Sequence, residues 1–108
     1  MAETLGEFEH LILLAILQLG GDAHAAGVRE KVEREADRKV TRGALYATLE
    51  RLTAKHLVDW EVEESTSSRG GIPRRRFRVT EPGVEALRRT HAAVRTLSRG
   101  LERLLGEA

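Results

Sequence analysis

The chain has 108 residues, of which 41% are hydrophobic and 32% charged, and its formal net charge is +1 at pH 7. This size and composition predict one globular domain and exclude a histone-like polycation, so any nucleic-acid binding must come from a local cluster of charge. The absence of cysteine excludes disulfides, thiolate metal sites and cysteine nucleophiles, and it favours a reducing cytoplasm.

The first predicted element is a helix from about Thr4 to Leu19, which ends at the glycine pair Gly20-Gly21. Its second half is apolar on every side, so we expect a second subunit to cover one face; the alternative is a central core helix of one protomer. The apolar run from Leu11 to Leu17 is too short to cross a bilayer, and no lysine or arginine precedes it as in a secretory signal. We therefore expect a cytoplasmic protein with no membrane partner.

A second helix is predicted from about Ala25 to Glu35, with a narrow apolar stripe on one side and charged residues on the other. A third helix is expected to begin after Thr41, a residue type that caps helix N-termini, and to end near Lys55-His56. Leucines at i, i+4 and i+7 predict its buried side. These are Leu45, Leu49 and Leu52, and the opposite face carries Arg42, Gly43, Tyr46, Ala47, Glu50 and Arg51.

Strict alternation then predicts a half-buried strand, with Val58, Trp60 and Val62 on one side and acidic residues on the other. A loop rich in serine and glycine, Ser65 to Pro73, leads to a return strand. Loop and strand hold five arginines within ten residues and no acidic residue among them, namely Arg69, Arg74, Arg75, Arg76 and Arg78. Such one-sided charge repels itself, so we expect an anion to meet the hairpin. For Arg75 two roles stay open, a DNA contact or an ion pair with the outgoing strand.

Thr80 is expected to cap a last helix, with Glu81 and Pro82 in its first turn, and this helix is predicted to run to about Leu105. Its apolar residues recur in alternating steps of three and four, which is typical of a coiled-coil seam that needs a partner. The first helix of the same or of a second chain is the expected partner. The residues predicted for the dimer interface are Leu5, Phe8, Ile12, Leu87, Val94, Leu97, Leu101 and Leu104.

A helix followed by a basic hairpin is typical of a winged helix-turn-helix DNA-binding domain. We predict a mainly α fold with a small β-hairpin (α+β class). Residues 1–80 would form the winged helix-turn-helix domain, with a recognition helix at about 41–56 and a wing at about 57–79, and residues 81–108 a C-terminal dimerisation helix.

Such a domain would place the third helix in a major groove, with Arg42 reaching a guanine edge, and the slim wing tip in a minor groove. Gly43 would let the helix approach the duplex closely. The predicted DNA-binding residues are Thr41, Arg42, Gly43, Tyr46, Ala47, Arg51, Ser68, Arg69, Gly70, Gly71, Arg74 and Arg76.

The segments LGEFEHLILLAILQLG, TRGALYATLERLTAKHLVDWEVEE and RGGIPRRRFRVTEPG, with the terminal helix, resemble the PadR family of bacterial transcriptional regulators. The LY-xx-L-xx-L run and the following R-x-x-x-T-x-x-G carry this resemblance. It implies a winged helix-turn-helix homodimer, joined through its first and last helices, that represses by binding palindromic operators and is often relieved by a small molecule. It places the family's recognition-helix tyrosine at Tyr46 and its wing-tip basic residue at Arg69. The chain departs from the family at Ala47, where relatives usually have proline, and at His24, where many have tyrosine.

The four histidines lack metal-binding spacing, and the sequence has no P-loop, dinucleotide-binding or nucleophile–base pattern. We therefore expect no enzymatic activity, no metal and no cofactor. The few aromatic residues do not support an aromatic-lined effector pocket, so a small-molecule effector would be of unknown identity. The alternative function is a winged-helix protein-interaction module that binds an acidic partner without sequence-specific DNA recognition.

Overall fold

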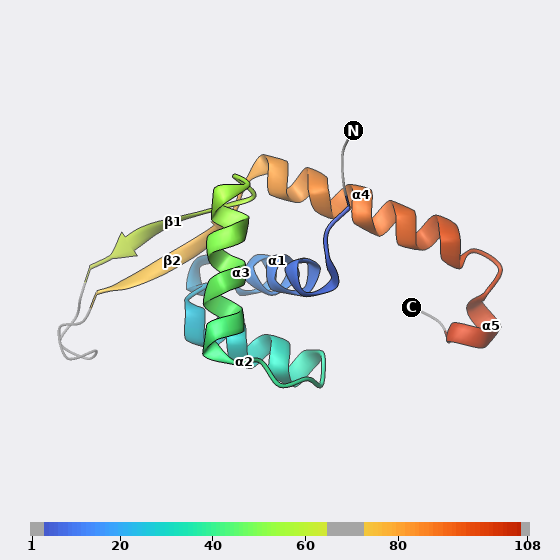
Figure 1. The fold of residues 1–108 in the computed structure, drawn as a ribbon, viewed down its shortest axis with the longest axis horizontal. Helices are drawn as coiled ribbons and strands as arrows, with labels where there is room; N and C mark the ends of the chain where they lie inside the picture. The colour runs from blue at the N-terminus through green and yellow to red at the C-terminus, as the bar shows by residue number, and fades with distance from the viewer. Residues whose placement is uncertain (1–3, 65–72, 107–108) are drawn as a thin grey trace.

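The computed structural model describes residues 4–64 and 73–106. In chain order the elements are α1 (Glu7–Leu19), η1 (Gly20–Asp22), α2 (Ala25–Glu35), α3 (Arg42–Ala54), β1 (Val58–Glu63), β2 (Arg74–Val79), α4 (Glu81–Ser98) and α5 (Glu102–Leu105). The helices α1 to α3 form one body, the hairpin β1–β2 projects from one side of it, and α4 leads away on the other (Figure 1). The predicted fold class, mainly helical with a small antiparallel hairpin, is confirmed.

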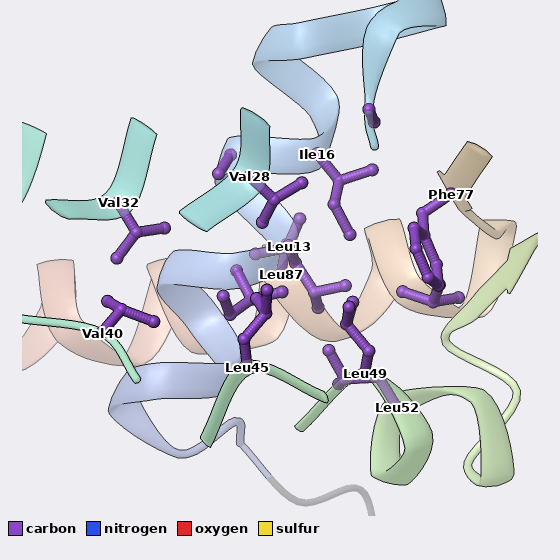
Figure 2. Close-up of a cluster of buried hydrophobic side chains, with 14 residues drawn as sticks. Leu13, Ile16, Val28, Val32, Val40, Leu45, Leu49, Leu52, Phe77 and Leu87 are labelled. Carbon is purple, nitrogen blue, oxygen red and sulfur yellow. The ribbon is translucent and has the colours of Figure 1, made fainter. Parts of the chain in front are cut away.

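The core forms where the apolar sides of the helices meet the base of the hairpin (Figure 2). The leucine seam of α3 is buried as its spacing predicts, and Phe77 of β2 closes the cluster on the hairpin side. Full burial of one such side chain contributes about 1.5–3 kcal/mol, so this cluster fixes how the elements pack. Its larger members are Ile12, Leu13, Ile16, Val28, Val32, Val40, Leu45, Leu49, Leu52, Val58, Phe77 and Leu87.

The first helix begins at Glu7 rather than at Thr4, because Gly6 has an extended backbone with φ −67° and ψ 159°. The residue before it is used elsewhere, since the Leu5 amide donates a hydrogen bond of 2.8 Å to Thr90 Oγ1 on α4. The start of the chain is therefore tied to the last helix of the same protomer.

The last helix does not run unbroken to Leu105, so that prediction was wrong. α4 ends at Ser98, and Gly100 has a φ of 86°, a left-handed conformation that glycine adopts without the strain of a side chain. The short α5 follows the break. The predicted coiled-coil seam is therefore divided between two helices.

The hairpin pairs in antiparallel register, with Val58 opposite Val79 and Glu63 opposite Arg74. The edge of β2 that faces away from β1 is held by the segment before α2. There the Phe77 amide donates a hydrogen bond of 2.8 Å to the Ala23 carbonyl. The hairpin is thus attached to the helical body along β2, while β1 is the outer strand.

The junction between the hairpin and α4 explains the threonine and glycine of the R-x-x-x-T-x-x-G motif. Thr80 Oγ1 accepts a hydrogen bond from the Gly83 amide at 3.1 Å and donates one of 2.7 Å to the His56 carbonyl. A Cβ on Gly83 would collide with the Leu57 carbonyl oxygen and lie 2.7 Å from Val79 Cγ1. Only glycine fits where α4 crosses this backbone so closely.

Candidate nucleic-acid interface

The N-terminal end of α3 is capped and open to solvent. Thr41 Oγ1 accepts a hydrogen bond from the Ala44 amide at 3.1 Å, which confirms the predicted cap and leaves the hydroxyl hydrogen for an outside acceptor. Tyr46 is 41% exposed, and a Cβ on Gly43 would meet no atom of the protein within 4 Å. The packing of the protomer therefore does not require glycine at this position. The uncovered residues on this face are Thr41, Arg42, Gly43, Tyr46 and Ala47.

Arg51 lies further along α3 and is engaged with α1, a contact that the sequence did not reveal. Its Nε lies 3.5 Å from Glu9 Oε2, and Lys55 Nζ lies 2.9 Å from the same oxygen. Burial by itself raises the pKa of Glu9, but hydrogen bonds from Lys55, the Gly6 amide and Arg51 bring it below its ordinary value. The Arg51 guanidinium therefore helps to hold α3 against α1.

The arginines on one face of β2 lie opposite carboxylates of β1. Arg74 pairs with Glu63 at 3.1 Å, and Arg76 pairs with Glu61 in the next rung of the same register. The return strand therefore does not repel itself as the sequence predicted, because its arginines pair with carboxylates across the two strands. The alternating acids of β1 were the signal that could have predicted these pairs.

His24, which precedes α2, is buried against the hairpin. Its Nε2 lies 3.1 Å from Glu63 Oε2, and this hydrogen bond is the largest cause that lowers the pKa of Glu63. Burial opposes it, and the hydrogen bond from Arg74 lowers the pKa further. The imidazole thus connects the start of α2 to the hairpin.

Arg75 lies on the other face of the hairpin from this pair. Its guanidinium carbon is 4.2 Å from the centroid of the Trp60 ring, and its Nη1 is 3.4 Å from Glu50 Oε1 on α3. The expectation of an acidic partner was right in kind, but the partner belongs to the third helix and not to the outgoing strand.

A hollow of about 430 Å³ opens between the start of α2, α3 and β2. No side chain caps the first amides of α2, so the donors of that helix N-terminus are free of intramolecular caps in the described structure. Tyr46 and Arg74 line the same space. Such convergence of N–H donors and positive charge suits a phosphate oxygen. Its lining residues are His24, Ala25, Ala26, Tyr46, Pro73, Arg74, Arg75 and Phe77.

Residues 13–89 match the family described as the transcriptional regulator PadR-like family. The chain belongs to the PadR-like family of transcriptional regulators. It carries a winged-helix DNA-binding fold and is a regulator rather than an enzyme, as predicted.

One solved structure of a relative supports this assignment, and two others share the fold. A PadR-like transcription factor from Bacteroides fragilis is 30% identical over 90% of this chain and 88% of its own, with a TM-score of 0.70. A PadR-like regulator from Bacillus cereus strain ATCC 14579 has 22% identity over 94% and 93% of the two chains, with a TM-score of 0.73. A winged-helix DNA-binding protein from STIV shares the fold at 16% identity, over 90% and 98% of the chains, with a TM-score of 0.63. No curated protein sequence matches the chain.

The predicted tip of the wing in this PadR-like chain, Ser68, Arg69, Gly70 and Gly71, lies outside the described residues.

Within residues 4–64 and 73–106, no group of three His, Asp or Glu side chains is placed to hold a metal ion. In the same ranges, no helix combines the length and apolar character needed to span a membrane.

The predicted dimer residues separate into two groups. Ile12 and Leu87 lie in the core of their own protomer, so placing them at a subunit interface was wrong: their side chains already fill the space between α1 and α4. Leu5 and Phe8 pack partly against the same core, and the Arg38 guanidinium lies 5.1 Å above the Phe8 ring. By contrast, large apolar side chains remain exposed beyond Thr90. These are Val94, Leu97, Leu101 and Leu104 from the predicted set, with Leu105 in addition.

Proposed function

We propose that this PadR-like regulator is a cytoplasmic homodimeric repressor that binds a palindromic operator in double-stranded DNA. In this proposal α3 reads base edges in a major groove and the hairpin contacts the adjacent minor groove and phosphates. The observation that carries it is the uncovered N-terminal face of α3, next to the hairpin, in a chain whose family regulates transcription. Arg42 is the residue assigned to a guanine edge.

The phosphate contacts are assigned to the hollow between α2, α3 and β2. Tyr46 and Arg74 line this space beside the uncapped amides of α2, and the Thr41 hydroxyl lies free to donate at the start of α3. Arg51 and Arg76 complete the set, each sharing its guanidinium with a carboxylate of the protein. For the tip, the proposal stays on the sequence: Ser68 to Gly71 are assigned to the minor groove.

The dimer is assigned to the free end of α4, to α5 and to Leu14 of α1. Leu97 is 79% exposed and Leu104 is 82% exposed, and apolar side chains gathered in this way typically mark an interaction surface. A two-fold dimer of such chains would place its α3 helices in major grooves about one helical turn apart, which calls for a palindromic operator.

We also propose a site for a small-molecule effector. A hollow of about 280 Å³ lies between α1 and α2, lined by Leu11, Leu14, Ala15 and Val32 among others. It adjoins the surface assigned to the dimer, so a bound apolar molecule there would alter how the subunits meet. A thermal-shift screen with hydrophobic cations and phenolic acids tests this assignment.

The deciding experiment selects duplexes that bind the full chain from a random DNA pool. We expect a palindromic sequence to emerge, and Arg42→Ala to relax the preference at one base pair of each half-site, at a cost of about 1–3 kcal/mol. Arg34→Ala, on the exposed side of α2, is the matched control and should leave the preference unchanged. Selection of no sequence, together with tight binding to an acidic protein or to heparin, would favour the interaction-module alternative instead.

A further inference from the structure

We infer that Arg75 is a positioning residue, held between Trp60 and Glu50, which sets the angle between α3 and the hairpin rather than binding DNA itself. This inference rests on the proposed DNA binding by those two elements. Trp60 and Glu50 would then affect operator affinity, although neither is assigned a DNA contact.

The Arg75 side chain contacts both the hairpin and α3. Arg75 occupies the hairpin face that also bears Trp60, one diagonal step away in the register, so its guanidinium can lie across the indole ring at 4.2 Å. The same guanidinium reaches Glu50 Oε1 at 3.4 Å. Among the ion pairs within residues 4–64 and 73–106, Arg75–Glu50 is the one that joins α3 to a strand of the hairpin.

Arg75 contacts α3 at a point beyond the base of the hairpin. The base of the hairpin is fixed in the core by Val58 and Phe77, whereas Val62 and Arg74, nearer the tip, are exposed. Figure 1 shows the strands continuing past α3 and away from the helical body. Arg75 therefore ties the hairpin to the recognition helix beyond the part that the core already holds.

A second contact holds the hairpin on its opposite face. Glu63, which alternates to the other side of the ribbon, is bound by His24 at the start of α2 at 3.1 Å. A ribbon held from α3 on one face and from α2 on the other cannot rotate freely about its long axis. Together these ties fix the width of the hollow that contains Tyr46, and so the spacing between the two elements assigned to DNA.

The Arg75 contacts are partly exposed, and exposed ion pairs contribute little to global stability. Their effect should therefore be seen in orientation and in DNA affinity more than in unfolding. Charge alone makes the opposite prediction for Glu50: removing a carboxylate from a helix that faces phosphates should tighten binding. The sign of the change separates the two explanations.

The test uses the full chain, its selected operator, and the variants Glu50→Gln, Arg75→Gln and the double variant. We expect Glu50→Gln to weaken operator binding by about three- to fivefold, and the double variant to be no weaker than Arg75→Gln. The log–log salt slope of Arg75→Gln should equal that of the wild type, because a lost phosphate contact would lower it by roughly 0.9. Trp60 is the single tryptophan of the chain, so its fluorescence should shift in each variant and report the loss of the stack.

Glu61→Gln is the matched control, since it removes a carboxylate paired to the neighbouring Arg76 without a contact to α3. It should bind the operator at least as tightly as the wild type. Binding by Glu50→Gln that is unchanged or tighter, or a slope reduced by about 0.9 in Arg75→Gln, would overturn the inference while wild-type binding stays intact. A wild-type chain that binds no duplex would instead overturn the proposed function, and the inference with it.

Discussion

Asp59 and Arg78 lie directly opposite each other in the hairpin, and the carboxylate holds the guanidinium through two hydrogen bonds of 3.0 and 3.1 Å. The pairing raises the pKa of Arg78 above its ordinary value. The same arrangement repeats towards the tip with Glu61–Arg76 and Glu63–Arg74. An arginine-rich strand in the sequence is therefore a nearly neutral surface in the folded hairpin, and its arginines differ in how free they are to meet DNA.

This difference gives the first prediction. Arg74 lines the hollow next to Tyr46 and the start of α2, whereas Arg78 lies near the hairpin base, outside that hollow, with Asp59 bound through both oxygens. Arg74→Gln should lower the log–log salt slope of operator binding by roughly 0.9, and Arg78→Gln should leave it unchanged. Equilibrium binding titrations from low to moderate salt measure both slopes. Equal slopes for the two variants would contradict the assignment.

Gly43 gives the second prediction. Because the protomer leaves open space around it, Gly43→Ala should raise the free energy of unfolding by about 0.5 kcal/mol through helix propensity. The added methyl group should also weaken operator binding about tenfold, or about 1.4 kcal/mol, because the helix could no longer approach the bases as closely. Denaturant titration and binding titration measure the two effects.

Gly27→Ala is the control for this pair of measurements. An added Cβ at Gly27 of α2 would make ordinary contacts of 3.8 Å, and the residue lies outside the hollow assigned to phosphates. It should stabilise the protein without changing DNA affinity. Unaltered affinity in Gly43→Ala would mean that α3 does not enter the groove at this point.

The third prediction concerns His10 on α1, whose pKa is lowered chiefly by burial and further by the charge of His91 on α4. His91 in turn shares a hydrogen bond of 3.1 Å with Arg95. The unfolded chain binds a proton at the ordinary histidine pKa of about 6.5 and the folded chain only at lower pH, so stability falls as the pH drops below about 6.5. His10→Gln should reduce this loss between pH 7.5 and 5.5, as measured by urea unfolding at each pH. An identical pH dependence in the variant would show that His10 is not the group responsible.

The fourth prediction separates the protomer core from the dimer surface. Leu97→Glu should leave the protomer folded but shift sedimentation towards the monomer, because its side chain is exposed. Leu87→Ala should instead cost about 2–4 kcal/mol of protomer stability, since Leu87 fills the core between α1 and α4. A dimer that persists in Leu97→Glu would place the interface elsewhere.

Local patterns predicted the elements well where one short stretch of sequence decides the structure. The bounds of α2, the caps Thr41 and Thr80 and the leucine seam of α3 all follow from residue type and spacing. The hydrogen bond from Leu5 to Thr90 that precedes α1 joins residues far apart in the chain, so no local pattern contains it. For the same reason Arg51 was assigned to DNA alone, because its contact with Glu9 exists only once α3 packs on α1.

Sequence proposed a set of residues for the surface assigned to DNA, but not their arrangement. Sequence could place Arg75 on a strand face, yet its partner became evident only from the approach of α3 to the hairpin. The break at Gly100 was a local signal that the regular steps of three and four obscured.

The closeness of α4 to the strand ends at Gly83 has a mechanical consequence. Gly83 packs against the Leu57 carbonyl, and Thr80 is hydrogen-bonded both to His56 and to the first turn of α4. The chain between the end of β2 and the first turn of α4 is therefore held rigidly. A rotation of α4 must therefore carry the root of the hairpin with it. In the proposed dimer, any change in how the two α4 helices cross would reach the hairpin assigned to DNA through this junction, without passing through the interior of the protein.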